Sequence, residues 1–224
     1  MTRRAENGFK LPFMRKAVGV FGRLLWAIAM LSKDAKCLRN TKGTQAPADL
    51  GRWFWQRLIG INGGAYWPMH PSSTVSYAQR IHIGIETSPG WSPGCMIHGV
   101  NGIIIGDYTQ ISQNVAILSG NHDPYALPKQ LPAQPIRIGK YCLLGFNSVI
   151  MPGVELGDYT IVGANAVVTR SFPDGYVVLA GAPASPVKTL EPELARDHVS
   201  APHQRYHGYV SAADFPEFAK NNLG

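Results

Sequence analysis

The stretch that decides the fold runs from Ile138 to Thr169 and reads IGKYCL-LGFNSV-IMPGVE-LGDYTI-VGANAV-VT. Every group of six opens with Ile, Leu or Val, and Gly follows at positions 139, 145, 157 and 163. The fifth residue of each group is small or β-branched. An α-helix places apolar residues about every 3.6 positions and a half-buried strand every 2, so a strict repeat of six fits neither element alone.

A repeat of six fits a coil with three flat sides, in which each side is a short strand followed by a turn. The aliphatic residue would point into a narrow core, the small residue would fit where the wall is crowded, and Gly would permit the corner. The pattern predicts a mainly β protein, a left-handed parallel β-helix of hexapeptide repeats, whose handedness is an exception to the right-handed crossover rule. A β-rich stretch with accidental spacing is the alternative.

The same phase of six begins near Val75 and slips after Ile83. Between Ile117 and Ile138 the spacing is 21 residues, which we interpret as one coil of 18 with three extra. The excess forms a proline-rich excursion loop within residues 119–137. From Val75 onwards the chain should form roughly six coils.

We divide the chain into a basic helical N-terminal extension (residues 1–61), the β-helix domain (62–190) and a short C-terminal helical tail (191–224). Apolar residues within Gly51–Ile61 predict a short helix that covers the open end of the β-helix, whose strand groups would otherwise be exposed. In the tail, Glu191–Val199 is expected to be helical.

The positive charge is concentrated near the N-terminus. Residues 1–57 hold twelve Lys and Arg against three acidic residues, and the remaining residues hold nine against eleven. A basic helix within residues 10–39 could lie on an anionic membrane surface or pack against the rest of the protein. Its apolar run, Ala17–Leu31, is shorter than the ~20 residues that span a bilayer. A signal peptide is a further alternative, against which Arg23 inside the run argues.

The cysteines and the charge of the β-helix part indicate the cellular compartment and the kind of partner. Three cysteines without paired spacing fit a reducing compartment, so we expect a cytoplasmic protein, at the inner face of the membrane if the basic helix binds lipid. Nucleic acid is not an expected partner, because the β-helix part is net acidic and its aromatic residues do not alternate with basic ones.

His122 begins the excursion loop, within the sequence SGNHDP at residues 119–124. An imidazole that titrates near pH 6.5 is a suitable base for a hydroxyl or amine that attacks an activated acyl group. A lone histidine on a loop is more often an ordinary surface residue, so the surrounding β-helix carries this interpretation.

Four motifs occur in order along residues 62–188: IGD at 105–107, NHDP at 121–124, the hexads up to Arg170, and AGAPA at 180–184. They resemble those of the hexapeptide-repeat acyltransferases, most closely the maltose/galactoside O-acetyltransferase-like group with its capsule and surface-polysaccharide enzymes. The resemblance implies an acetyl-CoA-dependent O-acetyltransferase that acts on a sugar hydroxyl of a glycan or polysaccharide precursor.

The resemblance also implies a homotrimer with active sites between neighbours, and direct transfer in a ternary complex. His122 would be the general base, and backbone N–H groups would stabilise the oxyanion. Acetyl-CoA would be the co-substrate, without a metal. The positions that match the family's cofactor-binding residues are Gly145, Phe146, Gly163, Ala164, Thr169, Arg170 and Lys188. The candidates for contact with the acceptor are Asn121, Asp123 and His98.

The sequence departs from the family in three places. Ser185 follows AGAPA where the family usually has Arg, and Phe146 is bulky where the family has a small residue. Trp91 and Ser92 lie near the place of the asparagine that contacts the sugar in galactoside enzymes. The acceptor should therefore differ from a simple galactoside or maltose.

Two alternatives remain. The chain could acetylate the amine of a nucleotide-linked amino sugar, or it could be a non-catalytic β-helix scaffold. A zinc enzyme of the γ-carbonic anhydrase type needs three histidines, two of them five residues apart. In the coils His82, His98 and His122 are 16 and 24 residues apart, which does not fit. His198, His203 and His207 have a closer spacing but lie in the tail.

Overall fold

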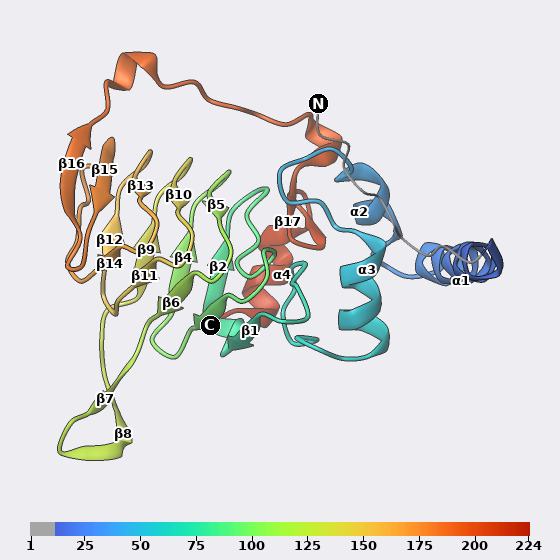
Figure 1. Cartoon of the computed structure of the whole chain (residues 1–224), viewed down its shortest axis with the longest axis horizontal. Coiled ribbons are helices and arrows are strands. Elements are labelled where there is room, and N and C mark those ends of the chain that lie inside the picture. The colour runs from blue at the N-terminus through green and yellow to red at the C-terminus, as the bar shows by residue number, and fades with distance from the viewer. Residues whose placement is uncertain (1–11) are drawn as a thin grey trace, which may run out of the picture.

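Three walls of parallel strands form a prism over most of residues 74–180 (Figure 1). The structure is a computed structural model that describes residues 12–224, with side chains from residue 20, so the start of the basic segment at residues 10–39 lies outside the described residues. The first wall contains β1 (Thr74–Ser76), β3 (Met96–His98), β6 (Ala116–Leu118), β11 (Val149–Ile150) and β14 (Val167–Val168). The second contains β2 (Ile81–Ile83), β4 (Ile103–Ile105), β9 (Ile136–Ile138) and β12 (Glu155–Leu156). The third contains β5 (Gln110–Ile111), β10 (Leu143–Leu144), β13 (Ile161–Val162) and β15 (Val177–Ala180), to which β16 (Ser185–Thr189) adds antiparallel.

The hexads occupy the walls as the sequence predicts. The chain passes from wall to wall every six residues, so Leu144 pairs with Val162 and Ile150 with Val168, each 18 positions on. The opening aliphatic residues of the six groups are 0–3% exposed and form one core with the small fifth residues. The predicted parallel β-helix is confirmed, and burial of these aliphatic side chains is its main source of stability.

The corners are made by residues other than the predicted glycines. The fourth residue of each hexad adopts a left-handed conformation: Tyr141, Asn147, Gly153, Tyr159 and Asn165, with φ between 54° and 71°. A Cβ on Gly145 would lie 2.5 Å from the carbonyl oxygen of Val162 in the next coil. Gly in the second place is therefore required by the close approach of neighbouring coils, and the expectation that it makes the corner was wrong.

The excursion inserts more residues than expected. Ile138 pairs with Ile105, 33 positions earlier, whereas uninterrupted coils pair 18 apart, so the insertion is 15 residues rather than a coil plus three. The first wall accordingly has five strands, and the estimate of six coils was too high. The insertion forms an antiparallel hairpin of β7 (Asn121–Asp123) and β8 (Ala126–Leu131), which projects from the prism (Figure 1).

Helices precede the prism: α1 (Pro12–Met30), α2 (Ala35–Asn40) and α3 (Leu50–Trp53), the last continued by a π-helical turn at Phe54–Leu58. Gln56 in this turn connects it to the chain that enters the first coil, since its side chain donates to Trp67 O (3.0 Å) and accepts from Met69 N (3.0 Å). In the described part of the chain, no helix has the length and apolarity needed to cross a membrane.

After β16 the chain runs back along the prism to the first coil (Figure 1). There it forms β17 (Tyr206–His207), β18 (Val210–Ser211) and α4 (Phe215–Asn222). Only a 3₁₀ turn at Pro192–Leu194 occurs in Glu191–Val199, so the expected helix there was wrong. A helix advances ~1.5 Å per residue and an extended chain ~3.3 Å, so only the extended form lets so few residues run along the coils.

Four stacked tyrosines line the path of this return segment (residues 191–200). The rings of Tyr108, Tyr141, Tyr159 and Tyr176 lie one per coil, with neighbouring centroids 5.0–5.3 Å apart. The Tyr108 hydroxyl lies 3.1 Å from Ser200 Oγ and accepts from Ser200 N (3.2 Å). Tyr141 donates to the His198 carbonyl and Tyr159 to the Asp197 carboxylate. The ladder therefore holds the return segment against one corner of the prism.

Candidate active site

The hairpin that carries His122 is fixed at its root. The Asn101 side chain donates to Ser119 O (2.8 Å), where the hairpin begins, and to Leu131 O (3.2 Å), where it ends. The Asn101 N–H also donates to Ser119 Oγ (2.9 Å). One side chain thus ties both ends of the insertion to the preceding coil.

The His122 imidazole has a defined tautomer in this hairpin. Its Nδ1 lies 2.5 Å from Leu127 O, and because a carbonyl oxygen only accepts, Nδ1 carries the proton. Its Nε2 lies 3.2 Å from the Gln130 amide nitrogen, which donates to it. The side chain is exposed. The ring therefore presents Nε2 as its basic atom, with a backbone carbonyl behind it, an arrangement suited to a general base.

Gln130 has a second unusual feature. Its Oε1 is buried and has no hydrogen-bond partner among the described residues. A buried polar atom without a partner is uncommon in native structures and indicates a strained or functional position. Rotation of the amide would turn this oxygen toward His122 Nε2, where it could accept a hydrogen bond from the imidazolium form.

The neighbours of His122 in its own strand have other contacts. Asp123 accepts from Tyr125 N (2.9 Å) and lies 4.0 Å from Lys129 Nζ, so its carboxylate stabilises the hairpin turn. Asn121 is exposed and pairs with Leu131. Contact of Asn121 and Asp123 with an acceptor stays a prediction.

His98 lies on β3, next to the strand from which the hairpin leaves. Its Nδ1 is 2.6 Å from Ser76 Oγ, and its ring meets Tyr77 edge-on at 5.5 Å. The His98 carbonyl accepts from Ser119 N (2.9 Å). The structure therefore brings His98 to the root of the hairpin, although its contact with an acceptor stays a prediction.

Four of the predicted cofactor-binding residues form one strip. Gly145 and Phe146 lie at the corner between the third and first walls, with Gly163 and Ala164 at the same corner of the next coil. Phe146 is 47% exposed, and its carbonyl accepts from Asn165 N (2.9 Å).

The other three lie elsewhere. Thr169 and Arg170 follow β14, at the opposite edge of the first wall, and Lys188 lies on β16. All three side chains are exposed. The structure thus places the predicted cofactor residues on different faces of one chain and does not bring them together.

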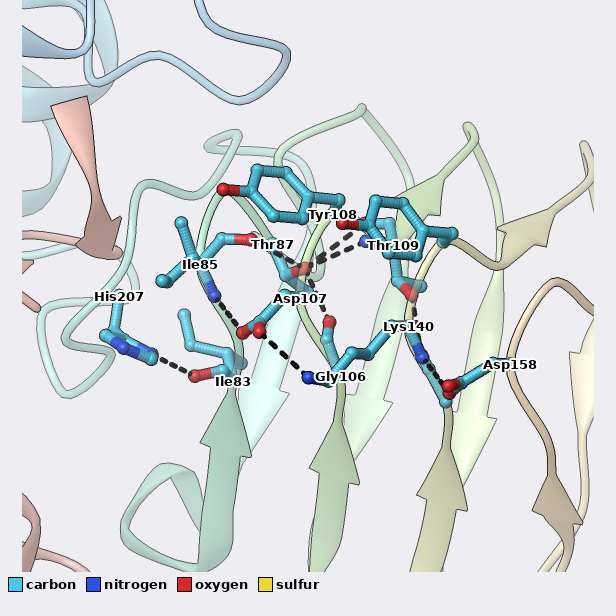
Figure 2. A network of polar contacts seen from close by, with 12 residues as sticks. Ile83, Ile85, Thr87, Gly106, Asp107, Tyr108, Thr109, Lys140, Asp158 and His207 are labelled. Carbon is cyan, nitrogen blue, oxygen red and sulfur yellow. Dashed lines mark hydrogen bonds and ion pairs between the residues drawn. The ribbon is translucent and has the colours of Figure 1, made fainter. Parts of the chain in front are cut away.

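Part of the IGD motif has a structural role, as Figure 2 shows. The Asp107 carboxylate accepts from Ile85 N (2.8 Å) in the preceding coil and lies 3.6 Å from Lys140 Nζ. Asp158, in the corresponding place of a later hexad, accepts from Lys140 N (2.7 Å). These aspartates join successive coils, so the motif indicates the coil structure and does not by itself indicate a catalytic site.

The thiols are unsuited to nucleophilic attack. All three cysteines are buried, and burial raises the pKa of Cys142 to about 11 and of Cys37 to about 12. Within residues 12–224 no group of three or more His, Cys, Asp or Glu side chains is arranged to hold a metal ion.

Asn101, Gln130 and the Leu127 carbonyl were missed in the sequence. Their roles depend on the antiparallel register of β7 and β8, in which His122 pairs with Gln130. That register lies in a proline-rich stretch without strand alternation, so no sequence signal separates these residues from other surface amides.

Comparison with known proteins agrees with this architecture. A family model described as "Bacterial transferase hexapeptide (six repeats)" matches residues 135–170. The chain is 32% identical over 181 residues to WcaF of Escherichia coli (strain K12), which carries a provisional assignment as a colanic acid biosynthesis acetyltransferase. That match covers 80% of this chain and 92% of WcaF.

A shorter match, 39% identical over 119 residues, is to nodulation protein L of Rhizobium meliloti (strain 1021), covering 52% of this chain and 63% of that protein. The crystal structure of a maltose O-acetyltransferase from Clostridium difficile 630 has the same fold, with a TM-score of 0.52 and 21% identity, over 77% of this chain and 86% of that one. The chain has the hexad walls and the matched repeats of this family, and WcaF aligns with four fifths of its sequence. It therefore belongs to the hexapeptide-repeat acyltransferases, among their acetyltransferases.

Proposed function

We propose that the protein transfers the acetyl group of acetyl-CoA to a sugar hydroxyl of a glycan or polysaccharide precursor. The observation that carries this proposal is the His122 imidazole, held through Nδ1 by Leu127 O so that Nε2, which accepts from Gln130, is its basic atom. The assignment of WcaF to colanic acid biosynthesis supports a polysaccharide acceptor.

In this mechanism His122 Nε2 takes the proton of the acceptor hydroxyl as its oxygen attacks the thioester carbonyl. The Nδ1–H bond to Leu127 O keeps the ring oriented while the imidazolium forms. The C–S bond then breaks, the acetyl group stays on the sugar oxygen, and the imidazolium proton passes to the thiolate of CoA. Backbone N–H groups would stabilise the oxyanion, and no acyl-cysteine intermediate is required.

Gln130 competes with the acceptor for His122 Nε2. Its amide N–H occupies the lone pair that the acceptor hydroxyl must reach. Binding of the acceptor would therefore displace this donor, and the rotated amide would present Oε1 to the imidazolium. Gln130 is in this scheme a positioning residue.

We further propose that left-handed coils of three chains associate as a homotrimer. All the predicted cofactor residues except Lys188 lie at two edges of the first wall, so a groove between neighbours would combine the Gly145–Ala164 strip of one chain with the hairpin of another. Apolar side chains around these regions are exposed, with Tyr125 98%, Leu127 67% and Phe146 47% accessible. Burial of these surfaces would favour association. A stable, active monomer in light scattering would contradict this assembly.

We also infer that the N-terminal segment contacts the cytoplasmic face of a membrane, while residues 62–190 carry the chemistry. α1 and the residue after it expose an apolar stripe of Val20, Leu24, Ile28 and Leu31, which are 68%, 59%, 42% and 90% accessible. The spacing of three and four places them on one helical face, and the surrounding segment is basic. Flotation of the full chain with anionic but not neutral vesicles would support this contact, and loss of the trimer on deletion of residues 1–45 would instead assign the stripe to packing.

The catalytic proposal is tested by His122→Ala. This variant should lower kcat/KM for acetyl transfer by ~10²–10⁴ and leave the Kd of acetyl-CoA unchanged, as for loss of a general base. His70→Ala, which replaces a histidine outside the hairpin, is the matched control and should retain activity. Acceptors that differ only in a hydroxyl or an amine separate O- from N-acetylation. Normal turnover by His122→Ala would contradict the mechanism.

A further inference from the structure

A cavity of about 950 Å³ lies at the end of the prism opposite β16, where α2, the first coil and residues 202–223 meet. None of the sequence-predicted site residues lines it. Its volume is in the range of sites that bind small molecules, ~300–1,000 Å³. The C-terminal tail, for which the sequence indicated no function, forms one side of it.

The lining contains more basic side chains than acidic side chains that could pair with them. Arg57 Nε pairs with Asp34 Oδ2 at 2.9 Å, and Asp214 accepts from the Ser211 hydroxyl. Lys33, Lys36 and Arg205 also line the cavity.

Among the described residues no carboxylate oxygen lies within 4.0 Å of the nitrogens of Lys33, Lys36 or Arg205. Lys33 precedes the N-cap of α2 and Lys36 lies in its first turn; both side chains are exposed, and Asp34, between them in the sequence, is paired with Arg57. Arg205 Nε donates to Ser200 O (3.0 Å), so its terminal N–H groups remain for a ligand. The three cations therefore fit a negatively charged group.

Neutral groups in the same lining suit a sugar. Asn40 and Gln79 supply amides that can bond hydroxyl groups, and Tyr77, which is 43% exposed, supplies an aromatic ring. Amides, an aromatic face and cations together match a saccharide that carries an acidic substituent better than they match a purely apolar ligand.

The cavity is connected to the candidate active site along one edge of the first wall. Tyr77 follows β1 and lines the cavity, and its ring contacts His98 on β3. Ser76, His98 and Leu118 pair in register on successive strands, and the His122 hairpin begins directly after Leu118. At ~4.8 Å per strand, the cavity wall lies about 10 Å from the root of the hairpin. An extended ligand could occupy both places.

We propose that this cavity is an acceptor subsite that binds a phosphate or carboxylate group on the glycan that is acetylated near His122. The proposal rests on the proposed function for the identity of the ligand as an acceptor. It assigns to Lys33, Lys36 and Arg205 the recognition of charge, at a distance from the transferred acetyl group.

Direct binding tests the subsite without turnover. Glucose, glucose 1-phosphate and glucuronic acid are titrated into the full chain by isothermal titration calorimetry at low ionic strength. At least one of the two anionic sugars should bind ten or more times more tightly than glucose, and this preference should weaken with added salt. A preference for glucose 1-phosphate indicates a phosphorylated acceptor, and a preference for glucuronic acid indicates an acidic sugar.

Charge variants locate the site. Lys33→Ala/Lys36→Ala should weaken binding of the preferred anionic sugar at least tenfold. Arg39→Ala/Lys42→Ala removes the same charge with the same spacing outside the cavity lining and should change it less than twofold. Arg205→Gln, in the C-terminal part of the lining, should weaken binding independently, which covers the case in which the double lysine variant fails to fold.

Two results would overturn the proposal: anionic sugars that bind no more tightly than glucose, or cavity variants that behave like the Arg39/Lys42 control. Because the assay needs neither acetyl-CoA nor His122, failure of the catalytic proposal would leave the binding result standing. Conversely, His122→Ala should bind the anionic sugar as the unmodified chain does, whereas a loss of binding in that variant would place the ligand elsewhere.

Discussion

Replacing Tyr108 by Phe should destabilise the protein more than the same change at any other tyrosine of the ladder. Tyr108 is 6% exposed and Ser200 is 5% exposed, so water cannot replace the lost hydroxyl. The stacked ring would remain in place, because only the oxygen is removed. The change therefore isolates the hydrogen bonds that hold the return segment (residues 191–200).

The magnitude follows from these contacts. The hydroxyl accepts from Ser200 N and contacts Ser200 Oγ, so the variant loses two hydrogen bonds and leaves a buried backbone N–H without a partner. A hydrogen bond contributes a net ~0.5–1.5 kcal/mol, and a buried donor left unsatisfied costs ~1–3 kcal/mol. We expect a loss of about 2–3 kcal/mol in the free energy of unfolding.

Two matched changes calibrate the result. Tyr141→Phe loses one hydrogen bond at an exposed contact, where water can substitute, and should cost less than ~1 kcal/mol. The Tyr176 hydroxyl makes no hydrogen bond to the described part of the chain, so Tyr176→Phe should change stability very little.

Urea unfolding of the three variants measures the order, and limited proteolysis within residues 191–200 reports release of the segment. If Tyr108→Phe unfolds at the same urea concentration as Tyr176→Phe, the ladder does not hold the return segment, and the reasoning is wrong.

Gly145→Ala, whose Cβ would lie 2.5 Å from the next coil, should lower the free energy of unfolding by ~1–3 kcal/mol. Gly163→Ala, where that approach is 3.1 Å, should cost clearly less, and equal losses in thermal unfolding would contradict the close-approach argument. Burial lowers the pKa of His207, so the unfolded state binds its proton more readily, and the contribution of His207 to stability should be lost as the pH drops below ~6.5 and stay constant above it. Urea titrations at pH 7 and 5 check this, and His207→Phe should reduce the difference. Gln130→Leu should lower kcat roughly 10–100-fold, because the His122 ring would no longer be held in place. Gln134→Leu is the control and should keep the kcat of the unmodified chain. Equal kcat values for the two variants would contradict a positioning role for Gln130.

The core of the fold could be predicted because one residue type recurs at one place in each side of the coil. Ile138, Leu144 and Ile150 are buried for the same geometric reason, so the period of six identifies them without further knowledge. The role of Gly145 could not be derived in the same way, because spacing does not distinguish a residue that turns the chain from one that a neighbouring coil approaches closely. That distinction requires the backbone angles of both coils.

The candidate site was predictable only at His122. Its motif is local, whereas the partners of its ring come from a hairpin register that depends on Asn101 in another coil. The cavity near α2 was not predictable at all, since its walls join Lys33 to Arg205 through contacts between distant parts of the chain. Sequence patterns identify residues that repeat along one element, but they do not predict contacts between residues that are far apart in the sequence.

The return of the tail to the first coil has a consequence for how the chain folds. Tyr209 N–H donates to Tyr66 O (2.9 Å), and Gly224 N–H donates to Gln79 O (3.0 Å), across well over a hundred residues in each case. Repeat proteins commonly fold by local addition of one unit to the next, but such distant contacts close only slowly. During synthesis on the ribosome the first coil therefore emerges long before residues 202–224, which cover it. A chain interrupted just after the last coil would contain every hexad and would still expose the ring of Tyr66, against which Phe215 and Phe218 pack.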